Sequence, residues 1–286
     1  MSENFGPERW AIDITKILNA VFGPDHFPIK VADVAKEVAR QKYPDDPIAV
    51  VRGANLPGFE GALYPAPEGK KGWAILYNDA IASAGRINFT LAHEFGHYLL
   101  HRRKRPQGVE CGEQDVVLWD SPYGQMENQA NVFAANLLMP FDDYRRLIPD
   151  RTAVTMDALS AAAERYGVSL MAAILRWMEF THARVILVLS RDGYVLWAKS
   201  NKPAFESRAY IKTKGMTVPV PPLSLAHGGA NLIRHTDTRD HESGVWLDEP
   251  VKEMAAASEQ FDFVISLLLL GPVPDFIWHR GERDSQ

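Results

Sequence analysis

The segment His93–His97, which reads His-Glu-Phe-Gly-His, constrains this chain more than any other stretch. Ile87, Leu91 and Phe95 recur every four residues around it, which predicts an amphipathic helix. On such a helix, two histidines four residues apart project from the same face, so their imidazoles can hold one metal ion. The segment therefore predicts a metal site on a helix.

The residue types in this segment match the H-E-x-x-H pattern of zinc peptidases. In that pattern Glu94 lies beside the first histidine ligand and reaches water at the metal. Capping signals predict the ends of the helix. Asn78-Asp79 offers an N-cap, basic residues 102–105 suit a helix C-terminus, and Pro106 then stops the helix.

Two histidines do not complete a catalytic zinc site, which needs three protein ligands and an open position. His101 lies eight residues after His93, about 12 Å along a straight helix, so both cannot bind one ion together with His97. A third histidine six residues after His97 is excluded, because Arg103 stands there. A carboxylate from another segment is therefore required.

A second predicted helix, at residues 127–140, offers that carboxylate. One face of it carries small and polar residues spaced by three and four: Glu127, Ala130, Asn131 and Ala134. The two alanines would let this helix approach the first closely. Glu127 would then complete a site of two histidines and one carboxylate. Asn131, one turn on, would hydrogen-bond a ligand histidine.

The polar loop between the two helices contains rival candidates. Glu110 and Glu113 are alternative carboxylate ligands, although a loop holds a ligand less rigidly than a helix. Cys111, the only cysteine, could be a metal ligand or an inhibitory thiol, but a lone cysteine is more often structurally silent, and that interpretation is preferred. Two tyrosines are candidates to donate a hydrogen bond to a developing oxyanion: Tyr98 and Tyr123.

Residues 86–97 and 127–140 together resemble the ImmA/IrrE family of metallopeptidases, and the resemblance is strongest over residues 30–150. It implies His93, His97 and Glu127 as metal ligands and Glu94 as general base. Members of this family cleave or inactivate helix-turn-helix repressors in stress responses and mobile elements. The resemblance therefore implies a protein substrate of that kind.

The donor set favours Zn²⁺, with Mn²⁺ and Fe²⁺ as alternatives. The predicted function is an intracellular zinc endopeptidase that cleaves a repressor and so releases stress-response genes. One alternative is a binding module that sequesters a repressor or binds DNA without proteolysis. Another is a metal-dependent hydrolase that acts on a small molecule.

The predicted fold class is α+β, in three parts. Residues 1–150 are expected to form a zincin-like metallopeptidase domain, with strands that precede the metal-binding helix. Residues 151–183 read as a helix-turn-helix-like segment. Residues 184–286 read as a separate α/β domain, and a resemblance to radiation-response members suggests that it is GAF-like.

Partners and compartment follow from charge and cysteine content. The net charge is −5, which gives no overall attraction to DNA or acidic membranes. Residues 151–181 carry three basic and three acidic residues, so direct DNA binding is disfavoured. The single cysteine excludes an internal disulfide, and the first residues lack a signal-peptide pattern. A cytoplasmic protein with no membrane association is expected.

Periodicity predicts the remaining elements. Residues 73–77 are expected to form a strand, which is either the edge that pairs with an extended substrate or an ordinary core strand. Residues 235–241, which contain two histidines and two aspartates, read as a solvated loop instead of a second metal site. Helices are expected at 8–22, 31–41, 142–148, 156–166 and 170–180, and strands at 48–52, 61–64, 184–189, 194–199, 210–212, 244–247 and 261–270.

Overall fold

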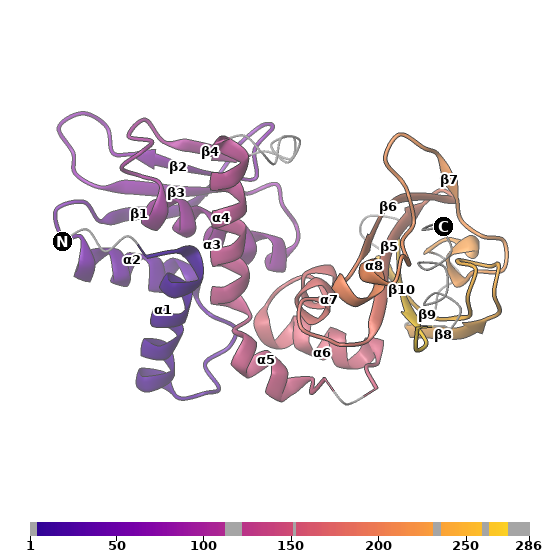
Figure 1. The fold of residues 1–286 in the computed structure, drawn as a ribbon. Coiled ribbons are helices and arrows are strands. Elements are labelled where there is room, and N and C mark those ends of the chain that lie inside the picture. The colour runs from indigo at the N-terminus through magenta and orange to yellow at the C-terminus, as the bar shows by residue number, and fades with distance from the viewer. Residues whose placement is uncertain (1–4, 112–121, 151–152, 231–235, 259–262, 274–286) are drawn as a thin grey trace, which may run out of the picture. The chain divides into compact units, whose positions relative to one another are not determined.

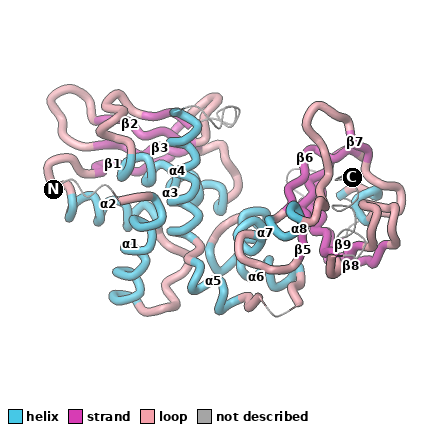
Figure 2. The backbone as a smooth tube through the Cα atoms, viewed as in Figure 1, coloured by secondary structure: helices cyan, strands magenta, loops and turns pink. Residues whose placement is uncertain are grey.

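The computed structural model describes residues 5–111, 122–150, 153–230, 236–258 and 263–273. The chain divides into two compact units, and each has its own sheet. Unit 1 is residues 1–147 with 162–169, and unit 2 is residues 148–161 with 170–286. Each unit combines helices with a sheet (Figures 1 and 2), so the α+β class is confirmed.

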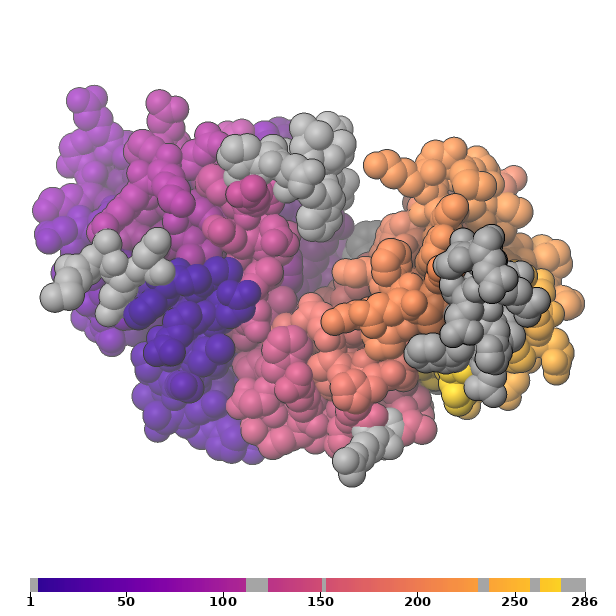
Figure 3. Space-filling view, viewed as in Figure 1, coloured from indigo at the N-terminus to yellow at the C-terminus, as the bar shows by residue number. Residues whose placement is uncertain are grey.

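Unit 1 opens with two helices close to the predicted ranges, α1 (Pro7–Phe22) and α2 (Val31–Lys42). Pro7 suits the first turn of α1, where an amide hydrogen would have no helical partner. Trp10 and Ile14 are buried on its inner face, whereas Phe22 is exposed. The outer surface of α1, coloured indigo, is visible in Figure 3.

Four strands form the sheet of unit 1 within the described residues, in the order β1-β3-β2-β4. Strands β1 and β3 are parallel, and the other pairs are antiparallel. The strand bounds are β1 Ile48–Ala54, β2 Gly61–Pro65, β3 Trp73–Asn78 and β4 Val109–Cys111.

This strand order corrects the expected substrate edge. Strand β3, which contains residues 73–77, lies between β1 and β2 and has no open edge. Trp73 and Ile75 are buried whereas Ala74 and Leu76 are half-buried, so one face of this central strand packs into the core. The open edges belong to β1 and β4. The sequence interpretation placed β4 in a polar loop.

The helix predicted around His93 is α3 (Ala84–Leu100), and the second predicted helix is α4 (Pro122–Leu138). The N-cap of α3 is Ser83, whose hydroxyl oxygen accepts a hydrogen bond from the amide of Arg86. The expected cap at Asn78-Asp79 is therefore wrong, since the Asn78 side chain instead accepts from the amide of Ala80 in a turn. The basic residues 102–105 lie beyond the helix.

Small residues let α3 and α4 pack closely. A Cβ atom at Gly96 would lie 3.2 Å from Cα of Ala130 and 3.0 Å from the Phe133 ring. Ala130 and Ala134 are fully buried at this contact. The other side of α3 packs against β2 and β3, so the segment from Thr90 to Leu99 is buried throughout.

Three short helices follow α4 at the predicted places. They are α5 (Phe141–Leu147), α6 (Met156–Tyr166) and α7 (Leu170–Met178). Gly167 separates α6 from α7 with a φ of +60°, a conformation that glycine adopts without strain.

Unit 2 contains an antiparallel sheet of six strands within the described residues, in the order β7-β6-β5-β10-β9-β8. Its predicted hairpin joins β5 to β6 through Asp192 and Gly193, both with positive φ. Helix α8 (Lys202–Glu206) and the 3₁₀ turn η2 (Leu225–Gly228) pack against this sheet. The strand bounds are β5 Arg184–Arg191, β6 Tyr194–Ser200, β7 Val218–Pro219, β8 Thr236–His241, β9 Val251–Ser258 and β10 Phe263–Leu270.

The strand predictions for unit 2 need three corrections. Residues 210–212 and 244–247 are not strands, and Gly244 has a positive φ within a turn. Residues 236–241 form the edge strand β8 instead of a loop, and His235 lies outside the described residues. Strand β9 was missed because its alanine-rich sequence has low strand propensity, which pairing with β8 and β10 overrides.

No helix in the described part of the chain is both long enough and apolar enough to cross a membrane.

Candidate metal centre

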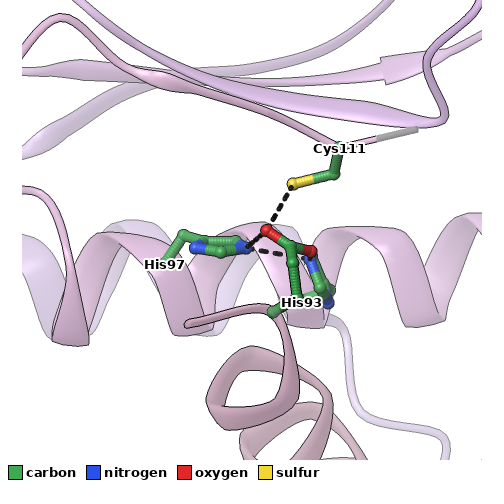
Figure 4. Close-up of side chains that lie close together, drawn as sticks. His93, His97 and Cys111 are labelled. Atoms are coloured by element: carbon green, nitrogen blue, oxygen red, sulfur yellow. Dashed lines mark hydrogen bonds and ion pairs between the residues drawn. The ribbon is translucent and has the colours of Figure 1, made fainter. Parts of the chain in front are cut away.

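Two histidines from α3 lie side by side (Figure 4), and one glutamate from α4 lies against both of them. The Nε2 atoms of His93 and His97 lie 2.9 Å apart. The Glu127 carboxylate faces both, with Oε2 at 3.1 Å from His93 Nε2 and Oε1 at 3.2 Å from His97 Nε2. The helical spacing of His93 and His97 and the close α3–α4 contact together create this arrangement.

A fourth side chain, Cys111, points into the same cluster from the end of β4 (Figure 4). Its Sγ atom lies 3.9 Å from Glu127 Oε1. One ligand-type atom from each of His93, His97, Cys111 and Glu127 lies within 4.8 Å of the other three. The sequence analysis preferred a structurally silent Cys111 over a metal ligand, because no local pattern ties a residue in this connection to the histidines.

The second nitrogen of each clustered histidine has its own partner. His93 Nδ1 lies 2.9 Å from Asn131 Oδ1, so this nitrogen donates to the amide oxygen. His97 Nδ1 lies 3.0 Å from His101 Nδ1, and His101 Nε2 lies 2.9 Å from Gln129 Oε1. Asn131 is where the sequence interpretation put it, whereas Gln129 was missed.

These contacts determine which ring nitrogens carry protons. Gln129 Oε1 accepts, so His101 donates from Nε2, and a neutral His101 then accepts at Nδ1 from His97. In their neutral forms, His97 and His93 therefore both direct an unprotonated Nε2 at Glu127. Lone pairs on two nitrogens and a carboxylate face one another at about 3 Å, which is unfavourable without a shared cation. The donor set thus fits a divalent metal.

Glu94, the residue between the two histidines in the pattern, is fully buried. Neither of its carboxylate oxygens has a hydrogen-bond partner among the described residues. Burial raises the pKa of Glu94 to about 7, although the charge of His93 opposes the shift. A carboxyl group in this range can accept and return a proton near neutral pH.

Gly61 makes room for this carboxylate at the start of β2. A Cβ atom at Gly61 would lie 2.6 Å from Glu94 Oε1 and 2.6 Å from Thr90 Cγ2. Real contacts do not reach that distance, so a side chain there would displace Glu94. Gly61 is a functional position that the sequence analysis did not single out.

The charges of the cluster suit a metal ligand set. Burial alone would raise the pKa of Glu127, but its close contacts with the His93 and His97 rings hold the pKa far below its usual value. Burial lowers the pKa of His97 to about 4, which favours the neutral ring. For His93, burial acts in the same direction, but the Glu127 contact and the Glu94 charge outweigh it and raise the pKa.

The remaining sequence candidates lie outside the cluster. The Tyr98 hydroxyl donates to the carbonyl of Asp46 at 2.6 Å, and the Tyr123 hydroxyl donates to the carbonyl of Glu110 at 2.8 Å. The Glu110 carboxylate accepts from Tyr64 at 2.5 Å. Glu113 lies outside the described residues. The structure does not bring either tyrosine or Glu110 to the ligand atoms.

Residues 45–178 match the model of a peptidase family described as the IrrE N-terminal-like domain. The matched range contains the four clustered residues, Glu94 and the whole of α3 and α4. A comparison with curated proteins found no match.

Proposed function

Residues 45–178 place the chain in the IrrE N-terminal-like family of metallopeptidases, and on this premise we propose that it is a zinc-dependent endopeptidase that cleaves a helix-turn-helix repressor. The observation that carries the catalytic part of the proposal is the convergence of His93, His97 and Glu127 from two helices. The choice of substrate rests on the family resemblance.

His93, His97 and Glu127 would hold the ion. When bound there, Zn²⁺ polarises a peptide carbonyl and lowers the pKa of water. Asn131 and His101 fix the ring orientations and keep the ligand nitrogens unprotonated. The same three groups also accept Mn²⁺ or Fe²⁺, so the choice of zinc rests on the usual preference of such sites.

Glu94 is the proposed general base. Its buried carboxylate meets no strong hydrogen-bond donor among the described residues, since the nearby Cys111 thiol donates only weakly, so one oxygen can take a proton from attacking water. The same oxygen can then deliver that proton to the nitrogen of the leaving amine. Gly61 leaves the space in which this carboxylate moves.

The open edge of β4 supports a peptide substrate. Strand β4 pairs only with β2 among the described strands, and it ends at Cys111 in the cluster. An extended segment that pairs with this edge would bring a peptide bond toward Glu94. We therefore assign substrate pairing to β4 instead of residues 73–77.

The other parts of the chain have proposed roles. Residues 151–183 are proposed to be a helix-turn-helix-like segment that contacts protein, since their charges balance. Residues 184–286 are proposed to be a GAF-like sensor domain, which the six-stranded antiparallel sheet supports. A cytoplasmic stress-response role is part of the same proposal.

The test compares wild type with Glu94→Gln against repressors encoded beside the gene. We expect wild type to produce defined fragments by mass spectrometry, and Glu94→Gln to produce none while it keeps its metal. Glu68→Gln, an exposed carboxylate, is the matched control. Full cleavage by Glu94→Gln would refute the mechanism. A repressor that stays intact but loses DNA binding would favour sequestration.

A further inference from the structure

The Cys111 thiol stands among metal-ligand atoms rather than in an apolar core. Its side chain is buried, and Sγ faces the Glu127 carboxylate at 3.9 Å. A free cysteine that only fills space behaves as a small hydrophobic residue and gains from apolar neighbours. Next to a carboxylate and two imidazoles, the sulfur gains little from packing.

The backbone holds Cys111 in this position. The amide of Glu60 donates to the Cys111 carbonyl at 3.0 Å, and Cys111 is the register partner of Gly61. A Cβ atom at Gly61 would lie 2.6 Å from Glu94 Oε1, so the Glu94 carboxylate lies against this residue. The fully buried Glu94, with no hydrogen-bond partner in the described residues, thus lies at the same end of the β2–β4 pair.

The distances fit a shared zinc ion. Bonds of about 2.3 Å to sulfur and about 2.1 Å to oxygen separate two tetrahedral ligands by about 3.6 Å. The observed sulfur–oxygen distance is 3.9 Å, and all four ligand-type atoms lie within 4.8 Å of one another. A thiolate is also a ligand that zinc prefers.

We infer that Cys111 is a fourth protein ligand, which closes the site formed by His93, His97 and Glu127. Catalytic zinc sites keep one position open for water, whereas sites with four protein ligands are structural. The closed form is therefore latent, and hydrolysis requires the thiolate to leave. This inference rests on the proposed function of the same site.

The position of Cys111 allows such a departure. Strand β4 has three residues and pairs with β2 alone among the described strands. Moving the end of a short edge strand breaks few hydrogen bonds, so a local opening costs much less than global unfolding. Cys111 can leave the site while His93, His97 and Glu127 keep their places on α3 and α4.

The experiment measures the reactivity of the thiol. Cys111 is the only cysteine, so the mass gained on alkylation by iodoacetamide reports on this residue alone. The full-length protein is stripped with a chelator and alkylated with and without one equivalent of Zn²⁺. We expect zinc to slow alkylation roughly tenfold or more, because a metal-bound thiolate is a poor nucleophile. Glu127→Gln, which weakens the site, should lose most of this protection.

A second measurement separates direct coordination from simple shielding. Wild type loaded with Co²⁺ should show a sulfur-to-cobalt charge-transfer absorption in the near ultraviolet, and Cys111→Ser should lack it. Circular dichroism confirms that the variant is folded. The alkylation assay on wild type needs no variant, so it tests the inference even if Cys111→Ser misfolds.

The outcomes separate this inference from the proposed function. Suppose that plasma mass spectrometry finds about one metal ion per chain, but thiol reactivity is unchanged and the charge-transfer band is absent. Cys111 is then not a ligand, and the peptidase proposal stands. No metal bound by wild type overturns both. Protection together with the band supports the closed site.

Discussion

The Nδ1 atoms of His97 and His101 lie 3.0 Å apart, with His97 in the last turn of α3 and His101 as its C-cap. His101 cannot reach an ion that His93 also binds, since the two are eight residues apart. His101 instead connects His97 to α4, because its Nε2 donates a hydrogen bond to Gln129 on that helix. Residues from both helices therefore determine which nitrogen of His97 is available to a metal.

His101→Ala should weaken Zn²⁺ binding by roughly 10- to 100-fold, because His97 then loses the acceptor that orients its ring. Competition against a chromophoric chelator measures the change. Gln129→Ala should weaken binding less, since His101 stays in place. Unchanged affinity in His101→Ala would mean that the contact has no part in orienting the ligand.

Glu127→Ala should lose the metal that wild type carries. The variant removes the only carboxylate in the clustered group, so two histidines and a thiol remain. Plasma mass spectrometry of the purified proteins measures the content, expected near one per chain in wild type. Glu110→Ala is the control, because its carboxylate bonds Tyr64 outside the cluster and it should keep the metal. Retention of metal by Glu127→Ala would remove Glu127 from the ligand set.

Gly61→Ala should lower both stability and peptidase activity. The new Cβ atom would lie 2.6 Å from Glu94 Oε1 and from Thr90 Cγ2, so the carboxylate has to move. Overpacking of this kind costs about 1–3 kcal/mol, which urea unfolding measures. Gly271→Ala is the control, because its Cβ atom meets no neighbour within 4 Å. Equal stability and full activity in Gly61→Ala would contradict the proposed position of Glu94.

Protonation of the Asp143 carboxylate should make unit 1 less stable at acidic pH. The Tyr166 hydroxyl donates to its carboxylate at 2.7 Å, and Arg165 donates at 3.2 Å. Burial raises the pKa of Asp143, but these bonds outweigh burial and hold the pKa below the usual 3.8. The stabilisation is therefore present above pH 3.8 and disappears as the pH falls through the lower folded-state pKa.

Urea unfolding of wild type and Asp143→Asn at a series of pH values tests this. The variant should be less stable than wild type at neutral pH, and the difference should shrink below about pH 4. A difference that stays constant across this range would show that ionisation of Asp143 contributes nothing.

Features that depend on local spacing could be predicted from the amino-acid sequence alone. Two histidines four residues apart share a helix face in any α-helix, so the pairing of His93 with His97 follows from their spacing alone. The spacing of Glu127 and Asn131 likewise placed both on one face of α4. The ranges of most helices followed from the same periodicity, with ends that moved by a few residues.

Which distant segments meet depends on the tertiary fold. The pairing of β3 with both β1 and β2 makes residues 73–77 a central strand and leaves β1 and β4 as the edges among the described strands. Three contacts join segments that are far apart in the sequence. They are Gly61 with Glu94, Cys111 with Glu127, and Gln129 with His101. No local period encodes them, because strand order and helix approach depend on how the whole domain packs its apolar surface.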